Sequence, residues 1–95
     1  MSDELSADIS KLLKRFINHE HSAYYGVAYN IVNKYGNELC YNVTWKEIEE
    51  QLEEELTHSN NTHKHAYISQ IKMKVCYWSL KILYKTHCLI YIQSI

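Results

Sequence analysis

Apolar residues recur at helical spacing through most of this chain, and this pattern predicts a protein made of amphipathic helices. The first stripe describes one face of a helix of about four turns. Its members are Leu5, Ile9, Leu12, Leu13, Phe16 and Ile17. A polar break at residues 18–22, in which Ser22 is a suitable N-cap, separates it from a second stripe. That stripe comprises Tyr24, Val27, Ala28, Ile31, Val32 and Tyr35. The pattern is compatible with two separate helices and with one kinked helix.

The middle of the chain carries signals for helix ends. Gly36 and Asn37 predict the end of the second helix, because glycine adopts the left-handed C-cap conformation without a Cβ penalty. Residues 39–43 are β-leaning and predict a strand or an extended connector. Thr44 and Glu47 fit a capping box, in which each side chain bonds the other residue's amide at the start of a helix. That third helix is expected to turn its apolar residues inward: Trp45, Ile48, Leu52 and Leu56.

The last segment is apolar on two faces. After a polar loop at residues 58–65, one stripe keeps helical spacing over about six turns. It consists of Ile68, Ile71, Val75, Trp78, Ile82 and Leu89. A second set lies on the opposite flank: Met73, Cys76, Leu80 and Leu83. The first stripe is expected to pack against the third helix. A helix that is apolar on two faces is usually central in its domain or shared with a second subunit.

These elements predict an all-α fold, a small three- to four-helix bundle that occupies residues 1–95 as a single domain. The chain contains no proline, which is compatible with long helices. An alternative arises because residues 88–92 are rich in β-branched side chains. They could pair with residues 39–43 as a short two-stranded sheet, which would make the domain α+β.

Charge divides the chain into two parts. Residues 1–57 form an acidic part with all eleven Asp and Glu residues, and residues 58–95 form a basic part with five lysines and no acid. Either the two parts neutralise each other within one fold, or the basic part meets an acidic partner. The first explanation predicts that the acidic helix at 45–57 packs on the basic, aromatic helix at 66–87.

The basic helix also supplies the candidate binding residues. Lysines alternate with aromatic residues along one side of it, and aromatic side chains beside cationic ones are common at the centres of interfaces. The candidate partner-binding residues are Lys74, Tyr77, Trp78, Lys81, Tyr84 and Lys85. They predict a non-enzymatic protein–protein interaction or oligomerisation module, acting through a homodimer or a larger protein partner.

Residues 43–52 resemble the first helix of a helix-turn-helix DNA reader, in which Thr-x-x-Glu-Ile starts the supporting helix. The chain departs from that pattern at Glu49, where alanine is usual, and after Leu52, where more acids replace the tight turn. Trp45 and the later lysine-rich aromatic helix also resemble Myb/SANT-type three-helix domains. These resemblances imply the alternative function, a small nucleic-acid-binding regulator that uses lysines and tyrosines against phosphates and bases.

Other classes of function lack a motif. No Gly-rich phosphate loop or nucleophile elbow is present, so we expect no enzyme activity, no cofactor and no small-molecule substrate. The six histidines have no cysteine at ligand spacing, so no metal is expected. Lys81, Lys85 and His87 interrupt the apolar segment 75–92, which argues against a membrane span. Three cysteines and an acidic start without a signal peptide predict a cytoplasmic or nuclear location.

Overall fold

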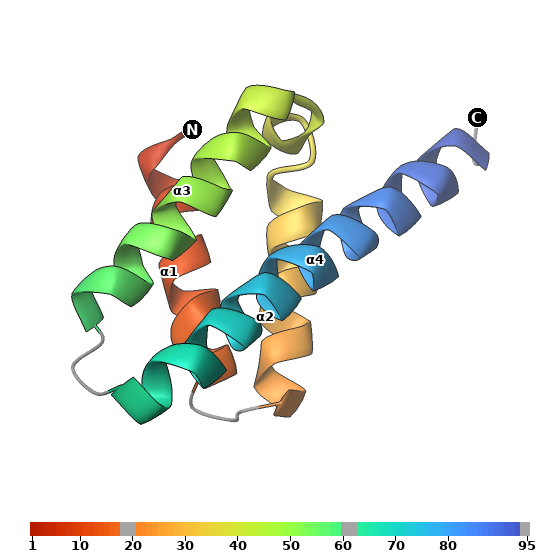
Figure 1. The fold of residues 1–95 in the computed structure, drawn as a ribbon. Helices are drawn as coiled ribbons and strands as arrows, with labels where there is room; N and C mark the ends of the chain where they lie inside the picture. The colour runs from red at the N-terminus through yellow and green to blue at the C-terminus, as the bar shows by residue number, and fades with distance from the viewer. Residues whose placement is uncertain (18–20, 60–62, 94–95) are drawn as a thin grey trace.

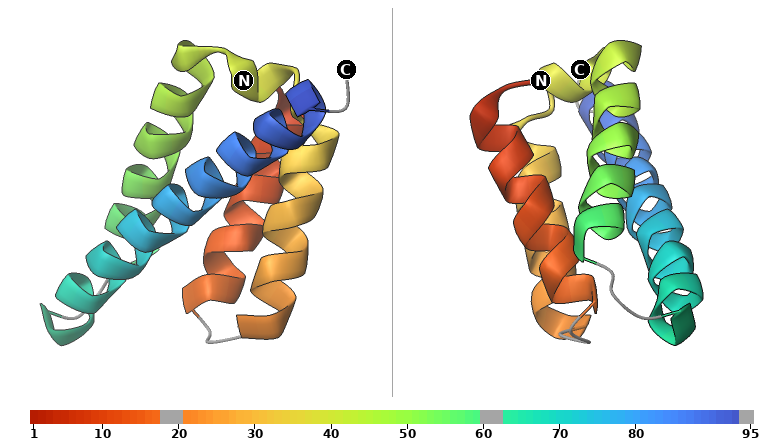
Figure 2. Two further views of the ribbon diagram at one scale, coloured as in Figure 1. Left: turned by 90° about the vertical axis from the view of Figure 1, so that its right-hand side faces the viewer. Right: turned by 60° about the vertical axis from the view of Figure 1, so that its left-hand side comes forward.

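Four helices form two crossing layers, one made of α1 and α2 and the other of α3 and α4 (Figure 1, Figure 2). The computed structural model describes residues 1–17, 21–59 and 63–93, with side chains for residues 1–17, 24–57 and 70–89. The elements are α1 (Asp3–Ile17), α2 (His21–Lys34), a 3₁₀ helix (Glu38–Cys40), α3 (Asn42–Ser59) and α4 (His63–Gln93). The predicted all-α bundle is therefore confirmed, and α1 and α2 are separate, antiparallel helices.

The apolar stripes of the first three helices meet in one core. The predicted stripe of α1 is buried from Leu5 to Leu13, and Phe16 and Ile17 pack at its edge. In α2 and α3 the predicted inward residues are also buried, apart from Val27, which is half-buried. The buried residues of these two helices are Tyr24, Ala28, Ile31, Val32, Trp45, Ile48, Leu52 and Leu56. Periodicity therefore identified the core face of α1, α2 and α3.

The sheet alternative is wrong for the part of the chain that the structure describes. Residues 38–40 form a 3₁₀ helix, and α3 begins at Asn42, so the predicted strand at 39–43 does not form. Residues 88–92 lie inside α4, which continues to Gln93. The 3₁₀ turn is held by Trp45, whose Nε1 donates a hydrogen bond of 2.6 Å to the Leu39 carbonyl oxygen. That bond ties the turn to α3 in place of a strand pairing.

Several predicted helix ends are also corrected. Ser22 lies inside α2, which begins at His21, and the polar loop is shorter than predicted because α3 extends to Ser59 and α4 starts at His63. The capping box is wrong, since Thr44 lies within the first turn of α3. Glu47 instead accepts a hydrogen bond of 2.6 Å from the Met1 ammonium group.

Gly36 serves close packing rather than a left-handed cap. Its backbone is not in the left-handed region, so the predicted C-cap conformation is wrong. A Cβ at this position would stand 3.3 Å from the Val32 carbonyl oxygen and 3.6 Å from the Nε2 of His87 on α4. Glycine thus lets α4 pass close to the end of α2.

A polar network that periodicity did not predict joins α1 to α3. Gln51 accepts a hydrogen bond of 2.7 Å from the Ser6 hydroxyl, and its amide nitrogen donates to the Ser6 carbonyl oxygen at 2.8 Å. The same nitrogen donates to the Ser10 hydroxyl at 2.9 Å, and that hydroxyl donates to Glu55. The polar groups of this network are hydrogen-bonded to one another, so the two helices are aligned by polar contacts as well as by burial of apolar side chains.

Tyr24 carries a buried hydroxyl that has no hydrogen-bond partner among the described residues. The Ser79 and Cys76 side chains lie close enough to influence its pKa, which burial raises well above the ordinary value. Burying a hydroxyl without a partner costs about 1–3 kcal/mol. We therefore expect Tyr24→Phe to raise the free energy of unfolding by up to about 1 kcal/mol. Urea unfolding of both proteins measures the change. A loss of more than about 1 kcal/mol would mean that the hydroxyl makes a stabilising bond.

Candidate interaction surface

One apolar face of α4 is exposed to solvent along the described length of the helix. The exposed fraction is 64% for the Trp78 side chain and 61% for Leu89, and it lies between 41% and 46% for the other three residues. We call this set the α4 seam: Ile71, Val75, Trp78, Ile82 and Leu89. A contiguous exposed apolar face of this kind is unusual on a monomeric domain, so the α4 seam is the candidate contact surface.

The α4 seam is the stripe that was expected to face the core. The structure buries the opposite flank instead, where Met73, Cys76 and Leu80 pack among α1, α2 and α3. The predicted contact between α3 and α4 is present, but the predicted pairing of Ile71, Val75 and Trp78 with α3 is wrong. Side chains of the buried flank lie between the other three helices, and the seam on the opposite side of α4 is left partly exposed to solvent.

Three of the six candidate partner-binding residues pack in a cluster around Trp45. The Tyr77 and Tyr84 rings lie 5.9 and 5.7 Å from the Trp45 ring, measured between ring centroids. The Lys81 ammonium lies 4.9 Å from the Tyr77 ring centroid and 5.7 Å from that of Trp45. These three residues therefore join α4 to α3, and only Lys74, Trp78 and Lys85 among the predicted set are exposed.

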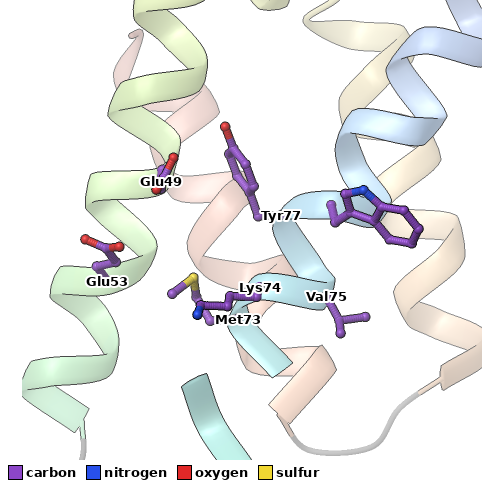
Figure 3. Close-up of a pocket in the computed structure, with 7 residues that line it drawn as sticks. Glu49, Glu53, Met73, Lys74, Val75 and Tyr77 are labelled. Carbon is purple, nitrogen blue, oxygen red and sulfur yellow. The ribbon is translucent and has the colours of Figure 1, made fainter. Parts of the chain in front are cut away.

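A row of lysines separates the α4 seam from the acidic face of α3. Lys74, Lys81 and Lys85 have no ion pair within the described part of the chain, so the expected pairing of these lysines with the glutamates of α3 is not formed. Glu49 and Glu53 do lie nearby, on the α3 side of a pocket of about 380 Å³, with Val75 on the far side of α4 (Figure 3). Met73, Lys74, Tyr77 and Trp78 complete its lining.

The surface thus has three neighbouring zones: an acidic zone on α3, a basic zone along one side of α4 and an apolar zone at the α4 seam. Comparison with protein-family models, curated proteins and solved structures finds no match. None of the helices in the described ranges has the length and apolar character needed to cross a membrane.

The helix-turn-helix resemblance does not extend to the structure. α3 continues without a turn through Leu52 to Ser59, so the arrangement in which a tight turn follows the first helix is absent from this segment. The tyrosines expected to meet bases, Tyr77 and Tyr84, have their rings against Trp45. Of the lysines expected to meet phosphates, Lys74 and Lys85 remain exposed.

A second pocket, of about 340 Å³, lies between the end of α2 and the C-terminal half of α4. Its lining brings together Cys40, Cys88, His87 and Tyr84, a grouping that the sequence did not indicate. The pKa of Tyr84 is raised to about 12, first by its hydrogen bond with Cys88 and then by burial.

No group of three or more His, Cys, Asp or Glu side chains within the described set has an arrangement that could hold a metal ion. The prediction that the histidines bind no metal also covers five whose side chains lie outside the described set: His19, His21, His58, His63 and His65.

The three cysteines differ in exposure, and this difference predicts their reactivity. Cys40 is exposed, Cys88 is half-buried and Cys76 is buried. Burial raises the pKa of the Cys76 thiol to about 12, and the thiolate is the reactive form. We expect a thiol reagent at neutral pH to label Cys40 first and Cys76 only on unfolding, as read by mass spectrometry of peptides. Labelling of Cys76 in the folded protein at the rate of Cys40 would contradict the packing of α4.

The same thiol predicts the direction of the pH dependence of stability. The pKa of an unfolded cysteine is about 9, whereas burial raises the pKa of the folded Cys76 thiol to about 12. Its contribution is therefore fully present below pH 9 and is lost as the pH rises from 9 to about 12. The buried Tyr24 hydroxyl acts in the same direction. We expect the midpoint of urea unfolding to fall above pH 9, and Cys76→Ala to reduce that fall.

Proposed function

We propose that this chain is a non-enzymatic protein–protein interaction module and that the α4 seam is its contact surface. The observation that supports this function is the exposure of Trp78, Leu89 and the three aliphatic residues at helical spacing on a helix whose other face is already buried. Burying such side chains contributes about 1.5–3 kcal/mol for each fully covered residue. Trp78 is suited to the centre of the contact, because tryptophan is enriched among the residues that dominate binding energy.

A contact at the α4 seam is compatible with the different environments of the two flanks of α4. One flank closes the core and the other remains available, so binding requires no unfolding of the domain. The lysine row gives the surface a charge that selects among partners. The nucleic-acid alternative has less support, because two of its tyrosines and Lys81 are engaged with Trp45, and the glutamates of α3 repel the same phosphates.

The proposal is tested by site-specific photocrosslinking in cells that express the chain. A photoreactive amino acid replaces Val75 in the α4 seam or, as a control, Asn30, which is exposed on α2. We expect discrete crosslinked complexes or dimers from position 75 and none of these from position 30. The combined variant Trp78→Ala, Ile82→Ala should abolish them while leaving the circular dichroism spectrum and Tm unchanged. Identical products from both positions, or products that survive the double variant, would rule out the α4 seam as the contact surface.

A further inference from the structure

The spacing of the α4 seam is that of a coiled-coil helix. Val75, Ile82 and Leu89 are separated by seven residues, and so are Ile71, Trp78 and Lys85. These two series correspond to the a and d positions of a heptad repeat, which form the contact between two helices. From Ile71 to Leu89 the seam is about 27 Å long at 1.5 Å per residue. This length gives two and a half heptads for a second helix to cover.

The residues that flank the seam determine which helix fits it. In the same register, the g positions hold Lys74, Lys81 and Cys88, and the e positions hold Lys72, Ser79 and Thr86. Charged residues at e and g set partner choice and orientation in coiled coils. α4 contains no acidic residue, so it offers no carboxylate to a lysine of a second copy. An antiparallel pair of α4 helices would place its g-position lysines opposite one another, and Lys85 would lie within the contact as a further positive charge.

We propose that the α4 seam binds an acidic amphipathic helix of another protein, one whose apolar stripe is bordered by carboxylates, rather than a second copy of this chain. This inference rests on the proposed function and specifies its partner. The partner's apolar residues cover Val75, Trp78 and Ile82, and its carboxylates lie over the exposed lysines Lys74 and Lys85. The glutamates of α3 limit the site on the far side of Lys74, because carboxylates placed beyond the lysine row would meet Glu49 and Glu53.

Electrostatic repulsion from the α3 glutamates also distinguishes this partner from an anionic membrane. A lipid surface is broad, so it would meet the lysines of α4 and the exposed glutamates of α3 together, and the latter would be repelled. A single helix is only about 10 Å in diameter, so along the seam it would meet fewer of the α3 glutamates than a lipid surface would. The geometry therefore favours a narrow acidic ligand over an extended acidic surface.

Three labelled synthetic helices test the inference by fluorescence anisotropy with the full chain. The first has leucine and isoleucine at a and d with glutamate at e and g; the second has lysine at e and g; the third has the glutamates of the first but a scrambled apolar pattern. We expect the acidic helix to bind at least about tenfold more tightly than the basic one, since attractive charge pairs replace repulsive ones. The scrambled helix should not bind.

Two variants locate the binding. Lys74→Glu combined with Lys85→Glu should reverse the preference between the acidic and basic helices, because both lysines are exposed and neither supports the core. Trp78→Ala combined with Ile82→Ala should remove binding of both. Asn30→Glu, an exposed substitution on α2, is the matched control and should change neither the binding of the acidic helix nor that of the basic helix.

The outcomes separate this inference from the proposed function. Equal binding of acidic and basic helices, or a dimer of the chain alone that depends on Trp78 in sedimentation velocity, would overturn the acidic partner and leave the α4 seam as an interface. Binding to phosphatidylserine vesicles that requires Trp78 would overturn it in favour of a membrane surface. No binding of any helix, together with no crosslinking from position 75, would remove both proposals.

Discussion

Leu80→Ala is expected to lower the free energy of unfolding by about 2–5 kcal/mol, whereas Ile82→Ala is expected to change it by less than about 1 kcal/mol. Both positions are aliphatic residues of α4, two residues apart, and alanine suits a helix at either one. The main difference between the two positions is their exposure, because Leu80 is 1% exposed in the core and Ile82 is 41% exposed in the α4 seam. Removing the Leu80 side chain leaves a cavity among the helices that surround it, while truncating Ile82 leaves only a smaller exposed surface.

This pair tests which flank of α4 is the core. Urea unfolding followed by circular dichroism gives both values, and unchanged slopes of free energy against urea would show that the unfolded states are comparable. For a domain of this size the total stability is about 5–15 kcal/mol, so the loss at Leu80 would be a large share of it. A larger loss at Ile82 than at Leu80 would mean that the seam is covered within the domain, and both proposals for it would then fall.

Trp45→Ala is expected to cost about 3–5 kcal/mol, the range for removal of a large buried aromatic side chain. Trp45 holds three elements together, because it bonds the Leu39 carbonyl of the 3₁₀ turn and packs against Tyr77 and Tyr84 of α4. The substitution therefore loses burial, a buried hydrogen bond and ring contacts at one site. It should also release Lys81, whose ammonium group lies over the Trp45 and Tyr77 rings.

Trp45→Phe separates the hydrogen bond from the packing. Phenylalanine keeps most of the ring contact but leaves the Leu39 carbonyl oxygen without this donor, a change expected to cost about 1–3 kcal/mol. Val43→Ala is a suitable control, because the Val43 side chain is 61% exposed on the same turn of α3. Unfolding followed by circular dichroism avoids the change in fluorescence that either substitution at Trp45 causes. A Trp45→Phe protein as stable as the original would show that the bond to Leu39 adds no net stability.

The helical architecture could be predicted because the aliphatic residues of each of the first three helices lie mostly on one face. In α1, for example, the polar residues Lys11 and Lys14 leave a single stripe that can enter the core, and the structure buries that stripe. The same reasoning could not choose between the two apolar flanks of α4. Spacing reports that a flank is apolar, whereas its burial depends on which flank the other helices contact.

The candidate site was predicted in part for the same reason. Trp78 was identified as a binding residue from its place beside lysines, and the structure leaves it exposed. Tyr77, Lys81 and Tyr84 were grouped with it, but their contacts with Trp45 depend on the angle at which α4 crosses α3. Helical projection treats one helix at a time and contains no information about that angle.

Helix starts were the least predictable features. Thr44 and Glu47 have the spacing of a capping box, yet the 3₁₀ turn before them places the first residue of α3 at Asn42. Glu47 then contacts Met1, a residue distant in sequence. A local motif was outweighed here by tertiary contacts, which no window of neighbouring residues contains.

The two flanks of α4 have a consequence for how this chain tolerates change. Substitutions at Met73, Cys76 or Leu80 should reduce the amount of folded protein, whereas substitutions at the α4 seam should spare abundance and reduce complex formation. Because the flanks alternate along one helix, a mutational scan scored separately for abundance and for binding should produce two out-of-phase helical periodicities from α4. The same separation would let the binding specificity of the seam be redesigned while the domain serves as an unchanged scaffold.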